Sequence, residues 1–269
     1  MRIAYGRMQK ARGLPGGCLL HACTCWLSDN PFGMITCGYK HVQKGRSMRI
    51  KNKTASIVWK VVLLVFGTYG LLDGSGILAG EYKTGFPNMF TNVSNLFAWG
   101  YFLLAVIWLV RNRDDEKAVT FAPMAKYTAT ISLLITMLIA HFMLFDAMFQ
   151  NGQLVWHLVV LHYIVPIMTL LDWALFDEKG KMPVWGPFAW MSLVVVYLVV
   201  VMIGAGPLGL NLGGGTTANV SRYPYTFLDP SISGVGGVVA FCGIMFVVFV
   251  VLGYILFGID KLLGRKADK

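Results

Sequence analysis

Charged side chains are scarce in this sequence: they make up 13% of its 269 residues, whereas hydrophobic residues make up 56%. A soluble domain needs a charged surface, and these charges are too few and too clustered to provide one. The scarcity therefore excludes a soluble globular enzyme. A helix of about 20 apolar residues spans the hydrocarbon core of a bilayer. Apolar segments near this length predict transmembrane helices at residues 57–78, 89–110, 124–148, 154–175, 185–203 and 235–257.

Acidic residues are scarcer than basic ones, 13 against 23, and the basic residues are unevenly placed. Six alternating helices put 21 of the 23 Lys and Arg on one side of the membrane and leave Lys83 and Arg222 on the other. Loops rich in Lys and Arg stay in the cytosol. The sequence thus predicts an all-α integral membrane protein with six transmembrane helices and both termini cytosolic. Its expected location is the cell membrane, which is the inner membrane in a Gram-negative bacterium.

The net charge of +10 does not predict a nucleic-acid partner, although a basic balance is typical of one. The positive charges follow one membrane face, where the anionic headgroups of lipids attract them. The expected partner is therefore the lipid bilayer. The sequence does not indicate an oligomeric state.

Cysteine is almost absent after residue 47, since four of the five cysteines precede it. Their spacing, C-x4-C-x-C, is not that of a zinc finger, and a C-x2-C pair is lacking. We therefore expect no metal at Cys18, Cys23, Cys25, Cys37, His21 and His41. Met48 opens a short basic lead before the first predicted helix. We expect residues 1–47 to be a disordered basic extension, 48–260 to be a six-helix transmembrane domain and 261–269 to be a basic cytosolic tail.

An internal repeat is also lacking, which disfavours an inverted-repeat transporter. Polar side chains inside hydrocarbon are costly, so each one in a predicted helix is a candidate functional residue. Eight of the nine fall in the outer halves of their helices, which predicts a water-accessible outer pocket. Ser, Thr and Asn in such helices also serve structural roles, through bonds to their own backbone or between helices. The nine are Asp73, Thr91, Ser94, Asn95, His141, Asp146, His157, His162 and Asp172.

Spacing along the helices narrows the candidates. Thr91 and Asn95 are four residues apart and share a helix face. His157 and His162 are five apart, which places them about 140° apart around a helix. His141 and Asp146 have the same spacing. Ligands on one helix need spacings of three or four, so we expect no metal and no cofactor.

Three sequence segments resemble a known family. They are MFTNVSNLF at 89–97, HYIVPIMTLLDWALF at 162–176 and RYPYTFLDP at 222–230. Over about residues 57–257 the chain resembles the bacterial branch of the androgen-induced protein family, which are six-helix membrane proteins. Animal members are threonine hydrolases that cleave fatty acid esters of hydroxy fatty acids. The resemblance implies that Thr91 is the nucleophile and that His162, four residues before Pro166, is its base.

The remaining roles follow from chemistry. A threonine hydroxyl needs a base to remove its proton, and a neutral imidazole can accept it. Asn95, with Ser94 beside it, is the expected oxyanion or substrate-positioning group. Asp146 or Asp73 is expected to orient His162. At 1.5 Å per residue, Thr91 lies about 3 Å below the start of its helix and His162 about 12 Å below its own, which opposes their contact.

By the same measure, His157 lies about 4–5 Å below the start of its helix, which matches the depth of Thr91 better. His157 and His141 are therefore kept as alternative residues. The connection from 204 to 231 ends in an aromatic and proline-rich segment that we expect to lie on the membrane surface. The sequence as a whole predicts an intramembrane lipid-ester hydrolase acting on a lipophilic ester. Two alternatives stay open: a non-catalytic structural membrane protein, and a transporter or proton relay that uses Asp73, His141, His162 and Asp172.

Overall fold

The computed structural model describes residues 23–26, 36–39, 49–116, 118–213 and 221–267. The chain divides into two units, Met1–Gly45 and Arg46–Lys269. In the first unit, strands β1 (Cys23–Trp26) and β2 (Thr36–Tyr39) pair antiparallel. Most of the segment expected to be disordered, 1–47, lies outside the described residues, and so do Cys18, His21 and His41.

The second unit is built from long helical segments. The first three are α1 (Lys53–Gly74), α2 (Phe90–Arg111) and α3 (Pro123–Met143). The fourth joins α4 (Trp156–Val159), the π-helical turn η4 (Val160–Ile164) and α5 (Val165–Phe176). The fifth joins α6 (Gly186–Trp190) and α7 (Ser192–Ala205), and the sixth is α8 (Pro230–Ala267). Within the described part of the chain, six helices are long and apolar enough to cross a membrane, which confirms that prediction.

The ends of the helices differ from the predicted ends for local reasons. α1 begins four residues early because the Asn52 side chain accepts a hydrogen bond from the backbone N–H of Ala55. It ends at Gly74, shortly before Gly76 takes a positive φ of 81°. A Cβ at Gly76 would lie 1.9 Å from the Glu81 carbonyl oxygen, so only glycine fits there.

The helix predicted to reach residue 148 ends at Met143 instead. A 3-10 turn, η3 (Phe145–Met148), and a hairpin of β3 (Phe149–Gln150) and β4 (Gln153–Leu154) follow it. Asn151 and Gly152 form the hairpin turn, both with positive φ. Asn-Gly is the residue pair that favours such a turn. α8 instead runs longer than predicted, into the segment expected to be a tail, and is kinked at Gly234.

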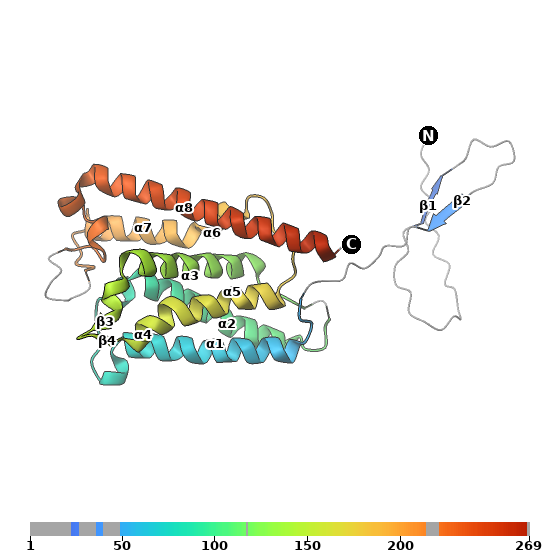
Figure 1. The fold of residues 1–269 in the computed structure, drawn as a ribbon, viewed down its shortest axis with the longest axis horizontal. Helices are drawn as coiled ribbons and strands as arrows, with labels where there is room; N and C mark the ends of the chain where they lie inside the picture. The colour runs from blue at the N-terminus through green and yellow to red at the C-terminus, as the bar shows by residue number, and fades with distance from the viewer. Residues whose placement is uncertain (1–22, 27–35, 40–48, 117, 214–220, 268–269) are drawn as a thin grey trace. The chain divides into compact units, whose positions relative to one another are not determined.

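Different elements lie at the two ends of the helical unit (Figure 1). We call the end that holds β3 and β4 the hairpin end, and the end where α1 begins and α8 finishes the terminus end. The short helices η1 (Ile77–Ala79), η2 (Phe86–Asn88) and η5 (Thr226–Leu228) connect helices at the hairpin end. Because the number of crossings is even, α1 starts and α8 finishes at the same end.

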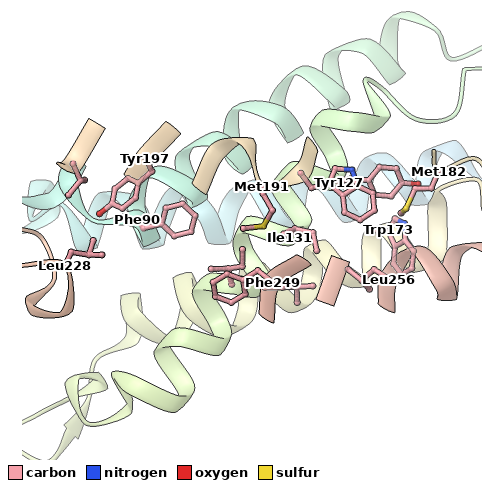
Figure 2. Packing of buried hydrophobic residues seen from close by; sticks show 14 of the residues in the cluster. Phe90, Tyr127, Ile131, Trp173, Met182, Met191, Tyr197, Leu228, Phe249 and Leu256 are labelled. Carbon is pink, nitrogen blue, oxygen red and sulfur yellow. The ribbon is translucent and has the colours of Figure 1, made fainter. Parts of the chain in front are cut away.

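Among the described residues, the buried apolar side chains form two clusters between the helices. The larger one joins α2, α3, α5, α6, α7 and α8, and Figure 2 labels its aromatic members Phe90, Tyr127, Trp173, Tyr197 and Phe249. The rings of Tyr127 and Trp190 lie 4.8 Å apart, and those of Phe90 and Tyr197 lie 5.1 Å apart. Large apolar side chains are also exposed along the helices, such as Val65, Val200 and Val247. A soluble protein rarely exposes so much apolar surface, whereas lipid chains would cover it.

A buried ionic cluster holds the terminus end together. Asp172 is fully buried, and its carboxylate accepts hydrogen bonds from Lys60, at 2.8 Å, and from Lys126. Asp177 lies 3.7 Å from Lys126 and accepts a hydrogen bond from Thr120. The count of Lys and Arg on each side of the membrane had assigned Lys60 and Lys126 to the cytosolic face, but the side chains of both are buried. The side chains of these two lysines and two aspartates thus pair with one another inside the bundle.

Candidate functional site

A π-helical turn and a proline leave one backbone carbonyl without a partner in its own helix. In η4 the N–H of Val165 donates to the Val160 carbonyl, one residue further back than in an α-helix. Pro166 has no N–H to donate. Neither residue therefore bonds the Leu161 carbonyl. The Asn95 side chain of α2 donates to it at 3.1 Å, and to the Thr91 carbonyl at 2.8 Å.

The π-turn presents His162 to the first turn of α2. The distance from Thr91 Oγ1 to His162 Nε2 is 3.1 Å. The other ring nitrogen, Nδ1, lies 2.8 Å from the Leu158 carbonyl oxygen. Because a carbonyl only accepts, Nδ1 carries the hydrogen, and Nε2 offers its lone pair to the Thr91 hydroxyl. The pair is arranged so that a neutral imidazole can take the threonine proton.

The comparison of helix depths was wrong about this contact. It assumed that the two helices begin at the same level and run parallel with constant rise. In the structure the fourth segment begins after a hairpin and contains a π-turn, so His162 reaches the level of Thr91. His157 instead lies 2.9 Å from Asp73, between Nδ1 and Oδ2, and joins α4 to α1.

The other predicted residues lie around this pair in different roles. Ser94 donates to the Thr91 carbonyl at 3.0 Å and also contacts the Thr136 hydroxyl. His141 is exposed and its Nδ1 lies 3.0 Å from the Tyr163 hydroxyl. Asp146 is exposed in η3, beyond the end of α3. The Leu158 carbonyl, and neither predicted aspartate, therefore orients His162.

Asn95 does not face the cavity beside Thr91. Its amide nitrogen donates to two carbonyls, and the residue is only 2% exposed. Its Oδ1 has no hydrogen-bond partner among the described residues. Asn95 thus links α2 to the π-turn by hydrogen bonds, and in this arrangement its amide hydrogens are not free to bind an oxyanion.

Thr91 and His162 lie in the wall of a cavity of about 740 Å³, a volume that includes its open mouth. Val195 of α7 and Phe246 of α8 line it and are 44% and 41% exposed, so its mouth lies at these two helices. A membrane-spanning bundle would present this mouth sideways to lipid. Most of the wall is apolar, including Ile135, Ile139, Val194, Leu198, Met245 and Phe249.

Tyr225 is a cavity residue that the sequence reasoning did not select. It belongs to the segment expected to lie on the membrane surface, and its side chain lines the cavity. The Tyr225 ring stacks on Phe227 at 5.0 Å, and Phe227 packs on Phe241 of α8 at 4.5 Å. The available signal was the RYPYTFLDP stretch, because a long connection rich in aromatic residues frequently carries function.

Among the described residues, no group of three or more His, Cys, Asp or Glu side chains is arranged to hold a metal ion. Comparisons of the chain with protein-family models, with curated proteins and with solved structures found no match.

Proposed function

We propose that this chain is an intramembrane lipid-ester hydrolase with Thr91 as nucleophile and His162 as base. The 3.1 Å contact between the Thr91 hydroxyl and His162 Nε2, in the wall of an apolar cavity, carries the proposal. The resemblance to the androgen-induced protein family agrees with these two residues. With the basic side of the bundle in the cytosol, both termini are cytosolic and the site lies in the outer half of the cell membrane.

The proposed reaction has two steps. Nε2 of His162 takes the Thr91 proton while Oγ1 attacks the ester carbonyl carbon, and the carbonyl electron pair moves to oxygen. The intermediate collapses, the alcohol leaves with the proton from Nε2, and an acyl-threonine remains. Water then gives a proton to the same nitrogen and attacks the acyl-threonine, and the acid leaves as Nε2 returns this proton to Thr91 Oγ1. The Leu158 carbonyl keeps the proton on Nδ1 and stabilises the imidazolium during each transfer.

The cavity supports a substrate with a long apolar chain. Its apolar wall residues give little to bind a sugar or a peptide, whereas an acyl chain gains from burial by about 25 cal/mol per Å² of apolar surface. A mouth at α7 and α8 admits a lipid from the bilayer without passage through water. The substrate class we propose is therefore a lipophilic ester.

No observation favours the proton relay. A relay needs exchangeable groups in sequence across the membrane, but the proposed members have separate partners. Asp73 pairs with His157, and His141 contacts Tyr163. Asp172 lies at the terminus end between two lysines, ten residues along the helix from His162. A non-catalytic membrane protein is an outcome of the experiment below.

The experiment measures covalent labelling of the detergent-solubilised full chain by an alkyl fluorophosphonate, together with hydrolysis of a long-chain acyl ester. We expect Thr91→Ala and His162→Ala to lose both activities. The matched control is Thr128→Ala, because Thr128 is a buried threonine whose hydroxyl bonds its own helix at Met124. The control should label like the parent chain. Labelling that persists in Thr91→Ala, or that is absent from the parent chain, would refute the proposal.

A further inference from the structure

The proposed hydrolase still needs a donor for the oxygen that becomes negative during attack, because the amide of Asn95 is already used. The segment from Ser221 to Ser231 supplies a candidate. Its two ends are tied together by Asp229, which accepts hydrogen bonds from the hydroxyls of Ser221 and Ser231, both at 2.6 Å. The closed segment holds Tyr225 at the cavity wall.

The Tyr225 hydroxyl lies at the N-terminus of α2, directly beside Thr91. It accepts a hydrogen bond from the backbone N–H of Phe90 at 3.1 Å, and it lies within hydrogen-bonding reach of the Thr91 side chain. The first N–H groups of a helix have no partner inside the helix and form the positive end of its dipole. Negative charge that develops near this hydroxyl is therefore stabilised by the helix as well.

One assignment of the hydrogens gives every group in this site a donor or an acceptor. The Phe90 N–H donates to the Tyr225 oxygen, so the tyrosine keeps its own hydrogen for another acceptor. Thr91 Oγ1 is within reach, and its own hydrogen points to Nε2 of His162. The ring then donates from Nδ1 to the Leu158 carbonyl. Each hydroxyl thus donates toward the histidine, and bonds aligned in this way strengthen one another.

We propose that Tyr225 is the oxyanion-stabilising donor of the site, an inference that rests on the proposed hydrolase function. Before attack its O–H donates to Thr91 Oγ1. When Oγ1 bonds the carbonyl carbon and its own proton moves to His162, the negative charge is on the former carbonyl oxygen. The Tyr225 O–H then turns to donate to that oxygen and keeps its proton throughout.

The surroundings of Tyr225 suit this role. Burial raises the pKa of the Tyr225 phenol above its ordinary value, so the group stays protonated at neutral pH. The stacked ring of Phe227 holds the phenol in position, and a donor held before reaction needs no reorganisation when charge develops.

The first test is Tyr225→Phe, which removes only the hydroxyl. We expect kcat for ester hydrolysis to fall by about 10²–10³-fold, as for loss of one oxyanion donor, with little change in KM. Fluorophosphonate labelling should slow in parallel. The matched control is Tyr223→Phe, because Tyr223 is buried in the same segment and does not line the cavity. Its kinetics should equal those of the parent chain.

A second test does not depend on how well Tyr225→Phe folds. A fluorinated tyrosine at position 225 keeps the hydroxyl but ionises at lower pH. Because a phenolate cannot donate, the alkaline loss of kcat should move to lower pH in this variant. The same replacement at Tyr223 should leave the pH profile unchanged. A purely structural hydroxyl would leave both profiles unchanged.

The outcomes separate this inference from the proposed function. If Thr91→Ala abolishes labelling while Tyr225→Phe retains the parent kcat, Tyr225 is not the donor, although the hydrolase stands. An unshifted alkaline limb with fluorotyrosine at 225 would also overturn the assignment. If Thr91→Ala labels normally, both the function and this inference fail.

Discussion

The bond between Asn95 and the π-turn gives a prediction that can be worked through from the structure. Asn95→Leu removes the group that bonds the Leu161 carbonyl, and Leu161 is 1% exposed. A buried acceptor left without a partner costs about 1–3 kcal/mol, whereas hydrogen bonds between membrane helices average about 0.6 and reach about 1.7 kcal/mol. The Thr91 carbonyl retains its bond from Ser94. We therefore expect Asn95→Leu to lower the free energy of unfolding by about 1–2 kcal/mol.

A second substitution, at Pro166, tests whether the Leu161 carbonyl is the cause of this cost. Pro166→Ala restores an N–H that can donate to Leu161, five residues back, as the other bonds of the π-turn do. In that background Asn95→Leu should cost less, which gives a coupling free energy of about 1 kcal/mol in a double-mutant cycle. Unfolding in mixed detergent micelles with increasing SDS measures all four chains. An equal cost of Asn95→Leu in both backgrounds would refute the account of the orphaned carbonyl.

The other predictions concern the ionic cluster, the second histidine and the topology. Asp172→Asn removes the negative charge that two buried lysines share, so it should lower the free energy of unfolding by about 3–5 kcal/mol. The control is Asp146→Asn, which changes an exposed side chain and should leave the SDS midpoint unchanged. His157→Ala breaks only a part-exposed pair with Asp73, worth about 0–1 kcal/mol, and should retain ester turnover. Loss of turnover in a folded His157→Ala chain would show that His157, and not His162, is the base. A reporter fused after Lys269 should be cytosolic and one inserted at Gly213 external, and both on the same side would contradict the six-helix topology.

The resemblance selected Thr91 and His162 as a pair, and the structure brings them together, but the reasoning from depth opposed the contact. Rise per residue is a property of one helix, whereas contact between two helices depends on where each begins and how each is wound. The π-turn at Val160–Ile164 follows from no periodicity in the sequence, although Pro166 marks its position in retrospect. The contacts of Asn95 with two carbonyls and the position of Tyr225 in the cavity wall were missed for the same reason.

Hydropathy alone predicted the number of long apolar helices, because it is a local property of about twenty neighbouring residues. The sequence also predicted that polar side chains gather in the outer half of the bundle, but the structure buries a second polar group, Lys60, Lys126, Asp172 and Asp177, at the terminus end. Which polar side chains contact one another depends on how the helices pack. Lys60 and Asp172 lie 112 residues apart in the chain and 2.8 Å apart in space, so a count of charges at helix ends could not show that this lysine is buried. The partner of a polar group inside a bundle is set by the packing of other helices, and that packing is a property of the whole fold.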